Sequence, residues 1–118
     1  MAHVVIRGSL DLQRFAEAFR PILERDGGDI LRADRIFLEA SGSKALVECL
    51  VVEAGRKQSF YIKIAAHEAK FNVRVDPICR VERSEGVKAL VARLGALALA
   101  ATPEGEVEVT SLVLPSSS

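Results

Sequence analysis

Residues 44–75 read KALVECLVVEAGRKQSFYIKIAAHEAKFNVRV. Apolar and polar side chains alternate along much of this stretch, which is the period of a β-strand with one buried face. The same period begins upstream, and it predicts four strands, at residues 35–40, 44–53, 58–65 and 70–75. The turns between these strands are only a few residues long, and short connections favour antiparallel neighbours. We therefore expect a four-strand antiparallel meander.

One helix is predicted on each side of the meander. The upstream helix begins after Ser9 or Asp11 as its N-cap, and Pro21 predicts a kink or a break near its end. The downstream helix begins after Ser84 as its N-cap. Apolar residues recur at the helical period in both, first at Leu12, Phe15, Ala16, Phe19 and Leu23 and then at Val87, Leu90, Val91, Leu94, Leu97 and Ala98. Short strands are predicted at residues 3–6 and 106–114.

The order strand, helix, four-strand meander, helix, strand indicates an α+β fold. Two helices that each carry one apolar stripe need a sheet face to cover, so we expect a mostly antiparallel sheet with both helices packed on one face. A chain of 118 residues has the length of one domain. We assign residues 1–114 to it and 115–118 to a disordered tail. The large side chains predicted to share one core are Phe15, Phe19, Phe60, Ile62, Phe71, Leu90 and Leu94.

Composition excludes several classes of function. Basic and acidic residues number 16 each, so no net charge draws the chain toward nucleic acid or an anionic membrane. The longest apolar run, residues 95–101, is far shorter than a membrane span. The first residues lack the pattern of a signal peptide, and the two cysteines have no framework of spacings. A cytoplasmic protein with reduced thiols and no membrane association is expected.

The Asp26-Gly27-Gly28-Asp29 run predicts a tight structural turn. Aspartate beside glycine is typical of turns, and one of the two glycines is expected to have a positive φ angle. Together with Glu24 and Asp34 these aspartates form a carboxylate cluster, but its spacing matches no calcium loop. We therefore predict turn chemistry and no metal site here.

The wider segment from Arg20 to Ile30 resembles the start of the NifU-type iron–sulfur scaffold domain. The resemblance rests on Arg20, Pro21, Leu23, Asp26, Gly27, Gly28 and Asp29. It extends over residues 12–38 and, more loosely, over 87–109, and it implies a helix–turn–strand geometry. Only Cys49 lies where that family has its cluster-binding cysteines, and a cluster needs several thiolates. The resemblance therefore implies an accessory role in iron–sulfur or metal handling rather than cluster scaffolding.

No catalytic, cofactor-binding or metal-binding residue is predicted. Cys49 lies in a strand that is apolar on both faces, where a cysteine is usually an inert core residue, whereas Cys79 near a strand end should be more reactive. His3 and His67 are far apart and pair with neither cysteine at a zinc-binding spacing. We expect no cofactor, and a non-catalytic role is favoured over an enzyme.

The strand at 44–53 suggests an interaction surface. One face, with Ala45, Val47, Cys49 and Val51, should meet the helices. The other face remains apolar although sheets of this kind usually leave it polar, and large exposed apolar patches on monomers are uncommon. The residues predicted to contact a partner are Leu46, Glu48, Leu50, Val52, Tyr61 and Lys63. We expect a homodimer or an adaptor that binds another protein through this face.

A nucleic-acid-binding role is the further alternative. The hairpin at residues 56–74 is locally basic, and a tyrosine among cations on a sheet face can stack bases. The residues that would form this face are Lys57, Tyr61, Lys63, Lys70 and Arg74. The ordinary alternative is a solvated sheet face with cross-strand pairs.

Overall fold

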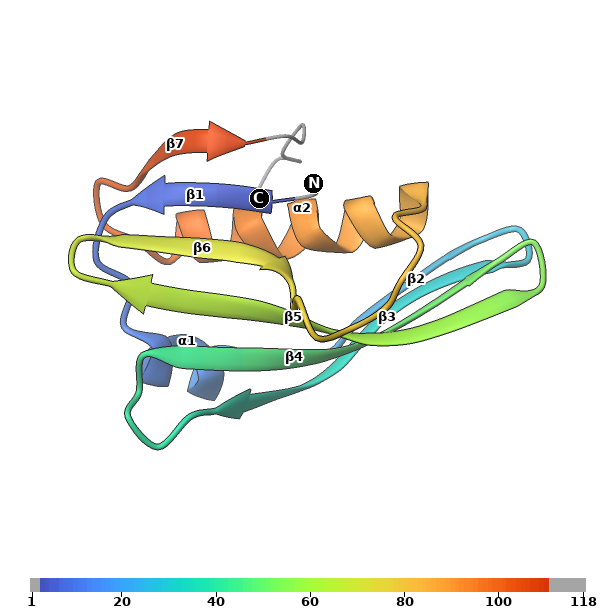
Figure 1. The fold of residues 1–118 in the computed structure, drawn as a ribbon, viewed down its shortest axis with the longest axis horizontal. Helices are drawn as coiled ribbons and strands as arrows, with labels where there is room; N and C mark the ends of the chain where they lie inside the picture. The colour runs from blue at the N-terminus through green and yellow to red at the C-terminus, as the bar shows by residue number, and fades with distance from the viewer. Residues whose placement is uncertain (1–2, 111–118) are drawn as a thin grey trace.

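The computed structural model describes residues 3–110, which form one curled seven-stranded antiparallel sheet and two helices (Figure 1). The strands are β1 (His3–Arg7), β2 (Ile22–Asp26), β3 (Asp29–Leu38), β4 (Lys44–Glu53), β5 (Arg56–His67), β6 (Lys70–Val75) and β7 (Glu106–Thr110), and the helices are α1 (Leu12–Ala18) and α2 (Glu85–Ala100). Along the sheet the order is β2-β3-β4-β5-β6-β1-β7. The predicted strand residues 111–114 and the predicted tail 115–118 lie outside the described residues.

The antiparallel meander is confirmed as strands β3 to β6. Each pairs with the next through a turn, and β4 and β5 stay in register from Lys44 opposite Ala65 to Glu53 opposite Arg56. The inner face of β4 is buried at every second residue: Ala45, Val47, Cys49 and Val51. The assignment of the two faces of β4 is therefore correct.

The upstream helix is shorter than its apolar pattern predicts. Asp11 is its N-cap, accepting a hydrogen bond from the backbone N–H of Arg14 at 3.1 Å, but α1 ends at Ala18. Its C-cap, Phe19, has an extended ψ of 136°, and Pro21 follows two residues later. Proline disfavours helical backbone in the residue before it, so the helix does not continue to Leu23. Leu23 instead lies in β2, where its side chain is 54% exposed.

Residues 20–30 therefore form a β-hairpin rather than the helix–turn–strand that the sequence suggested. β2 and β3 pair from Ile22 opposite Ala33 to Asp26 opposite Asp29. Gly27 has a φ of +61°, which confirms a glycine with positive φ in this turn. The sequence pattern missed β2 because a strand of five residues with one buried side chain has little alternation to detect.

Helix α2 begins where predicted and is held at its N-terminus by β4. The Ser84 hydroxyl accepts a hydrogen bond from the N–H of Val87 at 3.3 Å and donates one to the Glu53 carboxylate. The other oxygen of Glu53 accepts a hydrogen bond from the N–H of Gly86 at 2.9 Å. A strand carboxylate thus satisfies backbone donors that a helix N-terminus otherwise leaves unpaired.

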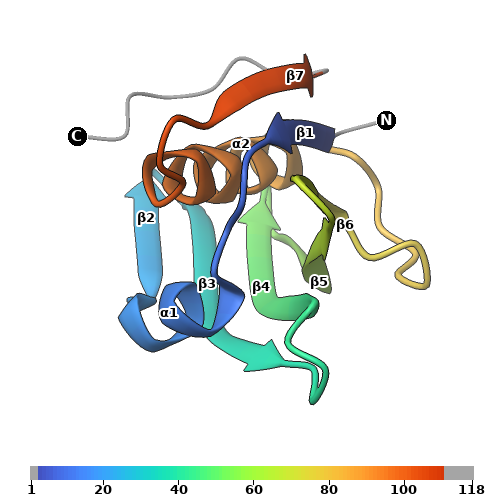
Figure 2. The same cartoon turned by 90° about the vertical axis from the view of Figure 1, so that its left-hand side faces the viewer.

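Both helices contribute to one hydrophobic core. Figure 2 shows the sheet curling around α2, from β2 on one side to β1 and β7 above it. Leu12 and Phe15 of α1 belong to the same buried cluster as Leu90 and Leu94 of α2, and Phe19 packs against it while partly exposed. The predicted core residues of the strands, Phe60, Ile62 and Phe71, are in this cluster as well. Within residues 3–110 no helix is long and apolar enough to cross a membrane.

Candidate functional site

The sheet face turned away from this core, called the outer face here, carries the predicted interaction residues. Four of them come from β4, where Leu46, Glu48, Leu50 and Val52 alternate with the buried inner-face residues and are each half-buried. When one face of a sheet is exposed to solvent, the side chains on that face are normally polar. Three of these four are aliphatic, so the face is apolar along β4.

The remaining two predicted residues come from β5 and lie beside them. Tyr61 is directly opposite Glu48, and Lys63 is directly opposite Leu46. Tyr61 is 36% exposed, and Lys63 is half-buried. The structure therefore brings all six predicted residues together on neighbouring strands.

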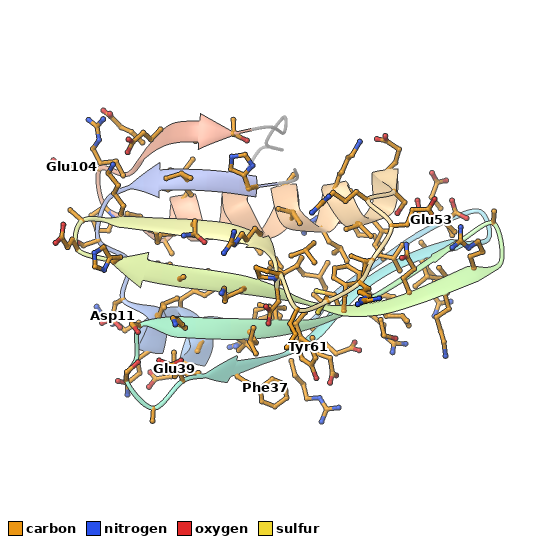
Figure 3. The ribbon with its side chains drawn as sticks, viewed as in Figure 1. Asp11, Phe37, Glu39, Glu53, Tyr61 and Glu104 are labelled. Carbon is orange, nitrogen blue, oxygen red and sulfur yellow. The ribbon has the colours of Figure 1, made fainter. Side chains whose placement is uncertain are left out.

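Strand β3 adds two apolar residues that the sequence interpretation did not include. Phe37 lies opposite Leu46 and is 48% exposed, and Ile30 lies opposite Val52. Figure 3 shows Phe37 and Tyr61 projecting from the strands on either side of β4. The sequence contains a signal for Phe37, because it lies in the predicted strand at residues 35–40 and alternates there with Ile36 and Leu38. That alternation places it on the face opposite to theirs.

Two ion pairs neutralise charges on this face. The Arg35 Nε donates to the Glu48 carboxylate at 3.2 Å across the β3–β4 pair. The Arg32 Nε donates to the Asp34 carboxylate at 3.0 Å beside the register shift of β3. The arginines of these pairs are exposed and the carboxylates partly so, and each pair contributes at most about 1 kcal/mol to stability.

Lys63 and Arg74 lie directly opposite each other on β5 and β6. Unlike the two ion pairs, they are both cations. Neither has an ion pair or a side-chain hydrogen bond within the part of the chain that the structure describes. The Nε of Arg74 is buried without a hydrogen-bond partner, as is the Oδ1 of neighbouring Asn72. Buried polar atoms are usually paired, and unpaired ones need an explanation.

Two hollows of about 390 Å³ each mark the outer face. The first lies where the segment after β6 runs along the edge of β5, held by a hydrogen bond of 2.8 Å from the N–H of Asp76 to the Tyr61 carbonyl. Its lining includes Arg32, Asp34, Glu48, Leu50, Lys57, Tyr61, Cys79 and Arg80. The second lies at the opposite end and is lined by Phe37, Leu38, Glu39, Lys44, Leu46, Lys63 and Asp76.

A larger hollow of about 470 Å³ lies between α1, β2 and α2. Its apolar wall includes Phe15, Phe19 and Leu97, and the ion pair of Glu24 with Arg93 lies at its rim. These side chains hold the helices and β2 against one another, and Phe15 belongs to the core. Packing accounts for this hollow, so we place no function in it.

The two cysteines differ in environment as predicted. Cys49 is buried on the inner face, and burial raises the pKa of its thiol to about 12. A thiol with such a pKa is neutral at physiological pH and is a poor nucleophile and metal ligand. Cys79 is partly exposed beside the first outer hollow, where its Sγ accepts a hydrogen bond from the N–H of Tyr61 at 3.4 Å.

The carboxylate cluster of the turn has structural partners. Glu24 pairs with Arg93, Asp34 with Arg32, and Asp29 accepts a hydrogen bond from the N–H of Ala54 at 3.2 Å. Within residues 3–110 no group of three or more histidine, cysteine or acidic side chains is arranged to hold a metal ion. These contacts fit the turn interpretation.

The predicted nucleic-acid face is only partly assembled. Lys57, Tyr61, Lys63 and Arg74 lie on the outer face. Lys70 shares this face but lies at the far end of β6, where its Nζ pairs with the Glu108 carboxylate of β7 at 3.0 Å. The remaining cations surround aliphatic side chains, Phe37 and Tyr61.

Comparison of the chain with known protein families, with curated proteins and with solved structures finds no match. The comparisons do not bear on the resemblance of residues 20–30 to the NifU-type domain, which stays a prediction. The site is therefore interpreted from its own geometry and charge.

Proposed function

We propose that this chain is a non-catalytic protein-interaction domain that binds its partner through the outer face of β3, β4 and β5. The observation that carries the proposal is the apolar row along β4, flanked by Phe37 and Tyr61, on the face opposite the buried core. The proposal takes both helices to pack inside the curl of the sheet, so that neither helix covers this row.

Burial of the row would supply part of the binding energy of a protein interface. Leu46, Leu50 and Val52 are half-buried already, so complete burial adds about 1 kcal/mol for each, which is less than the full value of about 1.5–3 kcal/mol. Phe37 is 48% exposed and adds a similar amount. Polar groups between them, such as the Arg35–Glu48 pair, would give orientation.

The first experiment is photo-crosslinking in the cells that produce the protein. A photoreactive phenylalanine analogue replaces Leu50 on the outer face or, as the control, Gln13 on the exposed side of α1. A discrete protein adduct from position 50, absent from position 13, supports the proposal, and its mass separates a second copy from another protein. Adducts of equal yield at both positions, or none at 50, would refute it.

Light scattering then tests directly whether the partner is a second copy of the chain. If the partner is the chain itself, the wild type has the mass of a dimer, and Leu50→Asp has that of a monomer. Gln13→Asp introduces the same charge on α1 and should leave the mass unchanged. A monomeric wild type at high concentration refutes the homodimer and directs the proposal to a different protein.

A further inference from the structure

The uncompensated cation pair on the outer face points to the chemistry of the partner. Lys63 and Arg74 are directly opposite each other on antiparallel strands, where Cβ atoms are about 4.5–5.5 Å apart. Like charges in such positions destabilise a sheet. The fold keeps this arrangement although burial leaves the Nε of Arg74 without any hydrogen bond.

The carboxylates nearest in the sheet do not neutralise the pair. Glu48, on the next row of the face, is bonded to Arg35. Asp76 follows Arg74 by two residues, and its Oδ1 accepts a hydrogen bond from the N–H of Ile78 at 3.2 Å. An external anion between Lys63 and Arg74 would satisfy both cations, and an arginine can bind a carboxylate through two N–H groups.

A hollow with an apolar wall adjoins the pair. It has a volume of about 390 Å³ and is lined by Phe37, Leu38 and Leu46 together with the charged residues Glu39, Lys44, Lys63 and Asp76. Phe37 is 48% exposed and so leaves an apolar surface open on the outer face, whereas Leu38 lies opposite the inner-face residue Ala45. The volume is enough for one large apolar side chain.

We propose that the outer face binds a segment of a partner protein in which a carboxylate lies next to a bulky apolar side chain. The carboxylate would lie between Lys63 and Arg74, and the apolar side chain would enter the hollow beside Phe37. This inference rests on the proposed function and names the partner's chemistry.

Charge favours an acidic partner over a second copy of this chain. Lys44, Lys57, Lys63, Arg74 and Arg80 on or beside the face have no ion pair within residues 3–110, and they outnumber Glu39 and Asp76, the two carboxylates of the outer hollows that likewise have none. Two such faces would repel each other on stacking, whereas an acidic segment is attracted. Aliphatic residues outnumber the two aromatic residues, Phe37 and Tyr61, along this face, which favours a protein over a nucleic acid that binds through a run of stacked aromatic residues.

The test is a titration of the isotope-labelled protein, followed by backbone amide shifts, with blocked tripeptides as probes. The first probe, acetyl-Glu-Asp-Phe-amide, carries both features. The second, acetyl-Gln-Asn-Phe-amide, has the same shape without charge, and the third, acetyl-Glu-Asp-Gly-amide, lacks the apolar side chain. We expect the first probe to shift amides in residues 37–46 and 63–74 and to bind at least about tenfold more tightly than the others. Equal affinity for the charged and neutral probes would overturn the proposal.

Variants distinguish binding from a structural role of the pair. Lys63→Gln and Arg74→Gln should each lower the affinity for the first probe about tenfold, because a charge-assisted hydrogen bond is lost. Thermal stability should stay equal or rise, because the repulsion between the two cations is relieved. Lys88→Gln, on α2 beside Glu85, is the matched control and should leave probe affinity unchanged. Lower stability in both outer-face variants with unchanged probe affinity would overturn the proposal.

The outcomes also separate this inference from the proposed function. Crosslinking at position 50 without binding of the acidic probe retains the interaction face and rejects an acidic partner. If an oligothymidylate shifts the same amides and the probe does not, the anion is a phosphate, and the peptide proposal is wrong.

Discussion

Substitution of Gly86 by alanine tests how closely α2 approaches the sheet. An ideal Cβ at this position would lie 2.8 Å from side-chain atoms of Leu31, Val51 and Glu53. Carbon contacts in protein cores are about 3.5–4.0 Å, so at least one of these side chains must move. Because Glu53 accepts a hydrogen bond from the N–H of Gly86 itself, its displacement would also remove one of the hydrogen bonds that cap the helix.

The magnitude follows from three opposing terms. Alanine is favoured over glycine in a helix by about 1 kcal/mol. Overpacking costs about 1–3 kcal/mol, and loss of an N-terminal cap costs about 0.5–2 kcal/mol. The cost exceeds the gain, so Gly86→Ala should lower the free energy of unfolding by roughly 0.5–4 kcal/mol.

Urea denaturation followed by circular dichroism measures this change. The matched control is Gly28→Ala, where a Cβ meets nothing within 4 Å and the backbone has no positive φ, so stability should change little or rise by up to about 1 kcal/mol. Glu53→Ala completes a double-mutant cycle, in which the cap is lost only once and the two effects are less than additive. A Gly86→Ala variant as stable as the wild type would refute the close approach of α2 to β4.

Four further predictions concern the core, the turn and the thiols. Leu94→Ala should lower the free energy of unfolding by about 2–5 kcal/mol, because Leu94 is fully buried on α2; a loss below about 1 kcal/mol in the same denaturation assay would contradict its core position. Gly27→Ala should lower stability by about 1 kcal/mol or more, because its φ of +61° is strained for alanine although the space is open; an unchanged midpoint would argue against this turn. Cys49 should react with a thiol reagent only after unfolding, whereas Cys79 reacts in the native protein, and mass spectrometry of the labelled peptides would reveal the opposite order. Burial raises the pKa of Cys49 from 9.0 to about 12 in the folded protein. The stability that the neutral thiol confers is therefore present below pH 9 and is lost as the pH rises toward 12. Denaturation of the wild type and of Cys49→Ala at a series of pH values measures this loss.

The meander was readable from the sequence because local and global preferences agree there. Alternation along β4 assigns Ala45, Val47, Cys49 and Val51 to one face, and the turns between strands leave little choice of partner. Ser84 likewise predicts the start of α2, because a capping hydroxyl before an apolar helical stripe is a local signal. Six residues of the outer face could be chosen in the same way, as the residues left over once the core face is assigned.

The segment around Pro21 shows where such reasoning fails. Leu12, Phe15, Phe19 and Leu23 fit one helical stripe, but the last of them belongs to a strand. Pairing with β3 decides this outcome, and the energy of that pairing depends on residues that local periodicity does not include.

The sequence by itself determined the period of the meander strands and of α2, the apolar environment of Cys49 and the glycine turn, because these depend on neighbours a few residues apart. Tertiary structure alone decided which distant groups meet. Glu53 reaches the N-terminus of α2 33 residues away, and Phe37 joins the row of β4 only through its register with Leu46. Lys63 and Arg74 become an uncompensated pair because β5 and β6 align them, and a shift of one residue would turn one of them to the other face. Register is set by the burial of the whole inner face, so the chemistry of the outer face is a consequence of the core.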